Sequence, residues 1–139
     1  MVEEKEEYIY KSFLALGQYS IILGEIKDNA NISVGKRSIR LMASFLSDPS
    51  NREIASLQMK EWLSDPVASQ NKTLQTMAAT MFVHEDNVKE AFRVLKNGSN
   101  IEQLAFTNIL RFYVIYLPIF FTFSIDTVCS FNYTLKSTA

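Results

Sequence analysis

Apolar residues recur along this chain at positions i, i+3, i+4 and i+7. This spacing puts the apolar side chains of each segment on a single face of an α-helix. Four segments match the template, so we expect an all-helical fold. The four apolar stripes are Tyr19, Ile22, Leu23 and Ile26; Ile39, Met42, Ala43 and Leu46; Leu74, Met77, Ala78 and Met81; and Val88, Ala91, Phe92 and Leu95.

Turn and capping residues mark the ends of the predicted helices. Asp48-Pro49 and Asp65-Pro66 interrupt the chain, since the residue before a proline avoids the helical conformation. Ser50-Asn51-Arg52-Glu53 and Ser99-Asn100-Ile101-Glu102 have the spacing of capping boxes. Together these signals predict short helices joined by tight turns, over residues 4–16, 18–27, 34–47, 51–64, 72–84, 87–96 and 100–111.

The stripes repeat at a nearly constant interval. The stripe that begins at Ile39 recurs 35 residues later at Leu74, and the one that begins at Tyr19 recurs 69 residues later at Val88. Sixty-nine residues are about two periods of 34 to 35. A period of 34 residues built from helix pairs is typical of tetratricopeptide repeats. We therefore predict a tetratricopeptide-like solenoid of about three helix pairs, in which each hairpin covers the apolar face of its neighbour.

An intermediate copy of the first stripe is expected near residues 54–61, and it is degraded. It keeps Ile54 and Leu57 but continues with Gln58 and Glu61. We expect the same helix to compensate with other apolar side chains, namely Ala55, Met59, Trp62 and Leu63.

Trp62 and the methionines each allow two interpretations. Trp62, the only tryptophan of the chain, either closes the degraded repeat as a core residue or anchors a partner. The methionines either fill gaps in the core or form an adaptable binding surface. A place in the core is the more common outcome for both kinds of side chain. The methionines concerned are Met42, Met59, Met77 and Met81.

Composition and charge exclude some classes of function. The chain has 139 residues, 47% of them apolar and 21% charged, with a net charge of −1. Nucleic-acid binding is not expected, because it needs a clustered positive surface and Gly35-Lys36-Arg37 is a short cluster. Cys129 is the only cysteine, so no intrachain disulfide forms, which fits a reducing compartment.

The amino terminus carries an acidic run. It has no apolar core, so we do not expect it to serve as a signal peptide. We expect the run to be the solvated start of a helix, where the helix dipole favours negative charge. Its members are Glu3, Glu4, Glu6 and Glu7.

Motifs that carry chemistry are incomplete. His84-Glu85 begins like a zinc-protease helix, but the second histidine would have to stand at Val88. Gly35-Lys36-Arg37-Ser38 fails as a phosphate loop, because Ala30 takes the place of the first glycine. Cys129 is expected to be a small apolar residue rather than a nucleophile. We therefore expect no catalytic, cofactor-binding or metal-ligating residues, and no enzymatic activity.

A family resemblance emerges from the centre of the chain. The stretch "SLQMKEWLSDPVASQNKTLQTMAATMFVHEDNVKEAF" resembles the epsilon subunit of coatomer, the COPI vesicle coat, in its plant-type versions. The segments "FLALGQYSIILGEIKDNA", "RSIRLMASFLSDPSNRE" and "SNIEQLAFTNI" are similar to other parts of the same family. The resemblance covers roughly Val2 to Leu110 and rests on extended sequence rather than on a catalytic motif.

The resemblance implies a structural or adaptor subunit of the COPI coat that is not an enzyme. It implies binding to the carboxyl-terminal domain of the alpha coatomer subunit, and to other coatomer subunits, in Golgi-to-endoplasmic-reticulum and intra-Golgi transport. The implied location is the cytoplasm and the cytoplasmic side of Golgi membranes and COPI-coated vesicles. No cofactor, nucleic acid or small-molecule substrate is implied. Full members extend beyond both ends of the matching region, and the resemblance carries over no partner-binding residue.

The final stretch differs from the rest, so we divide the chain into a repeat domain, 1–111, and an irregular apolar tail, 112–139. Phe112 to Ile125 contains no charged residue, and Asp126 follows. The tail is an alternative end from another transcript or an error in the gene model, a divergent capping helix or strand, or a membrane anchor. The alternative functions are accordingly a tail-anchored helical-repeat adaptor or a truncated product without function.

Overall fold

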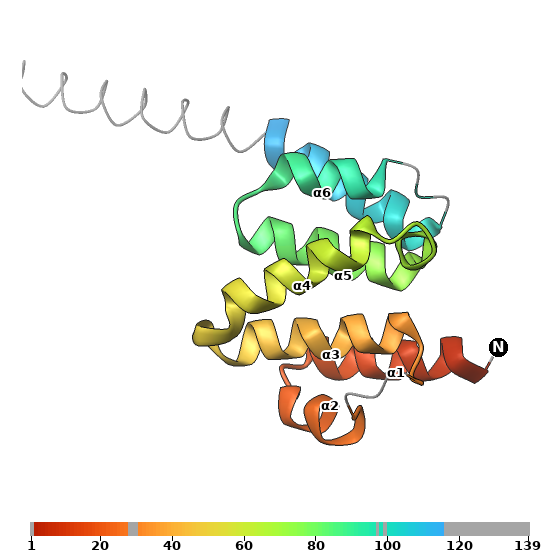
Figure 1. The fold of residues 1–139 in the computed structure, drawn as a ribbon. Helices are drawn as coiled ribbons and strands as arrows, with labels where there is room; N and C mark the ends of the chain where they lie inside the picture. Colours follow the sequence, from red (N-terminus) through yellow and green to blue (C-terminus); the bar gives the residue numbers. More distant parts are fainter. Residues whose placement is uncertain (1, 28–30, 97, 99, 116–139) are drawn as a thin grey trace, which may run out of the picture.

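The computed structural model describes residues 2–27, 31–96, 98 and 100–115, and every regular element in these ranges is helical (Figure 1). The expected all-helical fold is therefore confirmed. Residues 101–115 are also helical. The other elements are α1 (Val2–Ala15), α2 (Tyr19–Glu25), α3 (Val34–Ser47), α4 (Arg52–Ser64), α5 (Lys72–His84) and α6 (Val88–Leu95), with short 3-10 helices η1 (Pro49–Asn51) and η2 (Ala68–Gln70).

The helices stack as successive hairpins, from α1–α2 at the bottom of Figure 1 to α5–α6 near its top. Each helix packs on its hairpin partner, and α3 also packs on both α1 and α5. Residues 101–115 join the same row, because the buried Gln103 amide donates hydrogen bonds to the Gln75 side chain at 2.7 Å and to the Lys72 carbonyl at 3.4 Å. We call α1, α3, α5 and residues 101–115 the inner row. This arrangement agrees with the predicted tetratricopeptide-like solenoid.

Two of the hairpin turns are built in the same way. Gly17, after α1, and Asp86, after α5, both have the left-handed conformation, with φ of 74° and 59°. In each turn the next amide donates back into the helix, Gln18 to the Phe13 carbonyl at 3.0 Å and Asn87 to the Phe82 carbonyl at 2.8 Å. This is the Schellman pattern of helix ends. Gly17 and Asp86 are 69 residues apart, which is the offset of the apolar stripes.

Side-chain caps start three of the helices. The backbone amides of Lys36, Leu74 and Glu90 donate to the side chains of Ser33, Asn71 and Asn87 respectively, at 3.5, 3.0 and 3.4 Å. Each cap satisfies an amide that has no partner within its own helix.

The capping box predicted at Ser50–Glu53 is wrong. Asn51 precedes α4 without a side-chain cap, and Ser50 lies inside η1. Asp48 caps η1 by accepting a hydrogen bond from the Ser50 amide at 2.9 Å. Pro49 at the start of η1 favours this turn, because its ring presets φ and its missing N–H would be unpaired there in any case. The second predicted box includes Ser99, which lies outside the described residues.

The predicted stripes form the core. Ile22, Ile39 and Leu74 are fully buried, and Leu95 is 3% exposed. The remaining stripe residues are buried or packed against the buried cluster, except Val88, which is half-buried at the start of α6. The methionines belong to this core as well, which is the first of the two interpretations given for them; Met42, Met59, Met77 and Met81 are all buried.

The degraded repeat is compensated as predicted. Ile54 and Leu57, the surviving stripe positions, are both 66% exposed. Ala55 and Met59 of the same helix are buried instead. Trp62 and Leu63 are half-buried against the core, so α4 has turned a different face inward from the one that the repeat period indicates.

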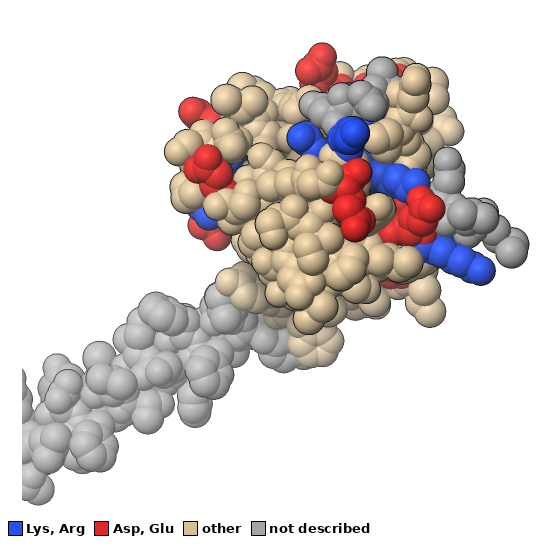
Figure 2. Space-filling model, turned by 90° about the horizontal axis from the view of Figure 1, so that it is seen from below, with Lys and Arg blue, Asp and Glu red and all other residues tan. Residues whose placement is uncertain are grey.

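The α1–α2 end of the stack mixes charged and apolar surface. Figure 2 shows the molecule from below Figure 1, with red and blue side chains beside a broader uncharged area. Ile9, Leu16 and Ile21, in α1, α2 and the turn between them, are all exposed.

The predicted division at residue 111 falls inside helical structure, because residues 101–115 are continuous helix. Residues 116–139 of the predicted tail, including Cys129, lie outside the described residues, so the division into two parts stays a prediction. Among the helices of the described ranges, none combines the length and the apolar character that a membrane crossing requires.

Candidate functional site

An apolar groove runs along the inner row and takes side chains from all four of its members. Its volume is about 470 Å³. Met42 and Leu46 of α3 and Met77 of α5 lie between Leu14 of α1 and Phe106 of residues 101–115. The other lining residues are Lys11, Ala15, Thr76, Thr80, His84, Glu102, Ala105 and Ile109. We call this cavity the apolar groove.

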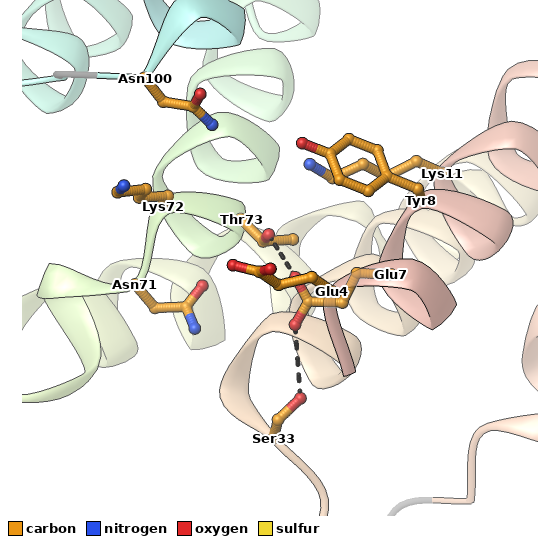
Figure 3. A pocket seen from close by; sticks show the side chains of 9 residues that line it. All are labelled: Glu4, Glu7, Tyr8, Lys11, Ser33, Asn71, Lys72, Thr73 and Asn100. Carbon is orange, nitrogen blue, oxygen red and sulfur yellow. Dashed lines mark hydrogen bonds between the residues drawn. The ribbon is translucent and has the colours of Figure 1, made fainter. Parts of the chain in front are cut away.

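A second, polar cavity of about 420 Å³ lies where α3, α5 and residues 101–115 begin (Figure 3). We call it the polar mouth. Ser33 and Asn71 cap α3 and α5, and Asn100 directly precedes residues 101–115. Lys11 lines both cavities. The remaining lining residues of the polar mouth are Glu4, Glu7, Tyr8, Lys72 and Thr73.

An ion pair crosses between the two outer members of the inner row. The Lys11 ammonium donates to both carboxylate oxygens of Glu102, at 3.1 and 2.9 Å. The two side chains are 15% and 33% exposed, so the pair is partly shielded from water. Lys11 also lies 5.1 Å from the centre of the Tyr8 ring, in cation–π geometry. The pair joins α1 to a helix three hairpins further along the chain, and Lys11 lies where the polar mouth meets the apolar groove.

Glu7 joins three helices at the polar mouth. Its carboxylate accepts hydrogen bonds from the Thr73 hydroxyl at 2.6 Å and from the Ser33 hydroxyl at 3.5 Å (Figure 3). Both donors stand at helix amino-terminal ends, where the helix dipole favours a negative charge. Gly35 is buried beneath this carboxylate, and a Cβ atom there would overlap it. A Cβ atom at position 35 would therefore displace the Glu7 carboxylate from these hydrogen bonds.

The acidic run is only partly solvated, which corrects the expectation for it. Glu4 is exposed, as expected. Glu6 forms an ion pair with Lys36 of α3, and Glu7 is bonded inward. Sequence gave no signal for these contacts, since the partners are about 30 and 66 residues away.

The residues with candidate chemistry remain apart. His84 ends α5, as expected, and is exposed, with its ring 6.3 Å from that of Phe45. Trp62 lies outside the apolar groove, where the Arg37 guanidinium stands 4.8 Å from its ring centre. Within the described residues, no three His, Cys, Asp or Glu side chains are arranged to hold a metal ion. The groove offers apolar contact surface and hydrogen-bonding groups, which suit binding.

Comparison with known proteins gives one consistent result. The family model for the coatomer epsilon subunit matches residues 1–112. Coatomer subunit epsilon-1 of Arabidopsis thaliana is 29% identical over 101 residues, which cover 73% of this chain and 34% of the relative. Coatomer subunit epsilon of Dictyostelium discoideum is 33% identical over 105 residues, covering 73% and 35%. The chain thus spans about a third of the length of these relatives.

Proposed function

Because this chain belongs to the coatomer epsilon subunit family, we propose that it is a structural subunit of the COPI vesicle coat that binds the alpha coatomer subunit. The contact is with the carboxyl-terminal domain of that subunit, and other coatomer subunits complete the coat. The chain then serves Golgi-to-endoplasmic-reticulum and intra-Golgi transport from the cytoplasm, attached to Golgi and vesicle membranes through the coat. The family is one of structural coat components, so we propose no catalytic activity.

The observation that carries this proposal is the apolar groove. Side chains of four helices supply its walls, and its volume is about 470 Å³. Leu14, Phe106 and Ile109 give it apolar walls that lose water contact when a partner segment enters. Since the walls belong to helices of different hairpins, a partner that fills the groove also joins the hairpins to one another.

The polar mouth supplies selectivity in this proposal. Asn71, Lys72 and Asn100 offer side-chain donors on one side, and Glu4 offers an exposed carboxylate on the other. A partner segment that leaves the apolar groove past Lys11 meets these groups. Mismatched polar groups there would stay unpaired, which disfavours other partners.

The direct test is co-purification with the carboxyl-terminal domain of the alpha coatomer subunit. Ile109→Glu places a carboxylate on the groove wall at a residue that is 63% exposed, so the fold should persist while binding falls at least about tenfold. Leu104→Glu is the matched control, because Leu104 is 52% exposed on the same helix and does not line the groove. A folded wild-type chain that does not associate defeats the partner assignment, and equal losses in both variants defeat the assignment of the groove.

A further inference from the structure

A separate crevice opens between α3 and α4, on the side of α3 that faces away from the apolar groove. Its volume is about 180 Å³. One wall follows α3 at the helical spacing i, i+3, i+4 and i+7, and the other follows one face of α4. The α3 wall consists of Arg37, Arg40, Leu41 and Ser44, and the α4 wall, together with the preceding turn, of Asn51, Ile54, Ala55, Gln58 and Trp62. We call this cavity the outer crevice.

Two arginines line the outer crevice. They are Arg37 and Arg40, and none of the lining residues is acidic. The Nε atom of Arg37 is buried and has no hydrogen-bond partner among the described residues. Its guanidinium is held 4.8 Å from the centre of the Trp62 ring, so the group is positioned before any ligand arrives. Ser44, Asn51 and Gln58 add neutral polar side chains to the same walls.

An apolar ridge flanks the outer crevice. Ile54, which lines it, and Leu57, one turn further along α4, are both 66% exposed. These are the stripe positions that the degraded repeat no longer buries. A small inorganic anion would not contact such a ridge, whereas a protein segment with apolar side chains would cover it.

We propose that the outer crevice binds an acidic segment of another protein, with a carboxylate side chain on the Arg37 guanidinium and an adjacent apolar side chain on Ile54 and Leu57. Arginine suits this role because its planar guanidinium pairs with a carboxylate through two parallel hydrogen bonds. The size of the crevice fits one acidic side chain rather than a whole helix. The site is distinct from the apolar groove, and it does not depend on the function proposed above.

The test uses the full chain and a short acetylated peptide, Gly-Ser-Asp-Leu-Glu-Leu-Ser-Gly. Because Trp62 is the only tryptophan in the sequence and lines the crevice, its fluorescence should shift saturably as the peptide binds. The matched peptide with Asn and Gln in place of Asp and Glu should bind at least about tenfold more weakly. Equal binding of the two peptides would overturn the proposal.

Variants are compared by anisotropy of a labelled peptide, since substitutions near Trp62 alter its fluorescence directly. Arg37→Gln removes one cation, and Gln58→Glu adds a competing carboxylate at a half-buried position of α4. Each should weaken binding at least about tenfold. Arg93→Gln, on the exposed surface of α6, should bind as wild type does, and so should Ile109→Glu of the apolar groove.

Two further results would contradict the assignment of the peptide site to the outer crevice. Unchanged affinity in a Gln58→Glu variant with a wild-type circular dichroism spectrum would mean that the peptide lies elsewhere. Full displacement of the peptide by sodium phosphate, but not by sodium chloride of equal ionic strength, would mean that the site takes small anions. Failure of the alpha-subunit co-purification leaves the crevice result unaffected, because different surfaces and probes are used.

Discussion

The Lys11 ammonium lies 2.9 Å from the Glu102 carboxylate, and this ion pair joins residues 91 positions apart in the sequence. It connects the first and last described members of the inner row. Its partners are more shielded than those of a surface pair and less shielded than those of a core pair. Its contribution should therefore lie between the values of those two classes.

We expect a double-mutant cycle of Lys11→Met and Glu102→Gln to give a coupling free energy of about 1 kcal/mol, which decreases at high salt. Urea unfolding of the four proteins measures it. The exposed pair Glu90–Arg93, with a 3.6 Å separation on α6, is the control and should give at most about 0.5 kcal/mol. Equal coupling free energies in the two pairs would contradict the larger contribution expected of the partly shielded Lys11–Glu102 pair.

Gly35→Ala should destabilise the fold by up to about 1 kcal/mol, because the new Cβ overlaps the Glu7 carboxylate and displaces it from its hydrogen bonds with Thr73 and Ser33. Urea unfolding again provides the measurement. Gly24→Ala is the matched control, since no atom of the described residues lies within 4 Å of a Cβ added at that position in α2. Alanine there should leave stability unchanged or raise it by up to about 1 kcal/mol, because glycine is the weaker helix former. Similar destabilisation by both substitutions would show that close packing at Gly35 is not the cause.

The two equivalent turns predict opposite effects on stability: removing glycine from the first should destabilise the fold, and introducing glycine into the second should stabilise it. Gly17→Ala should lower the free energy of unfolding by about 1 kcal/mol, since its φ of 74° strains any residue with a Cβ. Asp86→Gly should raise it by up to about 1 kcal/mol, because Asp86 has the same kind of conformation with a φ of 59°. Thermal unfolding of the two variants tests both signs. A destabilised Asp86→Gly would show that the Asp86 side chain contributes more than its backbone strain.

Stability should fall at alkaline pH partly through Tyr10. Burial raises the pKa of the Tyr10 phenol above its usual value of 10.0, and the charge and hydrogen bond of Glu25 raise that pKa further. The folded state therefore holds the phenolic proton more tightly than the unfolded state does. The stabilisation is complete below the unfolded pKa and is lost as pH rises from about 10 through the folded pKa.

We expect the wild-type chain to lose more stability than Tyr10→Phe when urea unfolding is compared at about pH 9 and about pH 11. The comparison removes the contributions of other groups, since both proteins share them. An identical loss in the two proteins would show that Tyr10 does not link proton binding to folding.

Local sequence accounts for most of the helices because the signals that start and stop them act over a few residues. The predicted bounds 34–47 and 72–84 coincide with α3 and α5. Ser33 and Asn71 cap these two helices with their own side chains. The box at Ser50 failed for an equally local reason, because Asp48-Pro49 forms a competing turn with the same residues.

The candidate site was predictable only in part. Met42, Leu46 and Met77, which line the apolar groove, all belong to recognised stripes. The roles of Glu7 and Lys11 had no counterpart in the sequence pattern, because their partners lie on other hairpins. An acidic run at a helix start is usually solvated, and only the packing of α1 against α3 and α5 turns Glu7 inward.

The sequence by itself determined which segments are helical, which face of most helices is buried, and that hairpins repeat along the chain. Each of these follows from spacings of a few residues or from one repeat period. Tertiary structure decided that α1 comes within ion-pair distance of residues 101–115, and that α4 turns Ile54 and Leu57 to the surface. The physical reason is that small rotations between successive hairpins add up along the stack. The distance between its first and last helices therefore depends on all the packing contacts together, and no single stretch of residues encodes it.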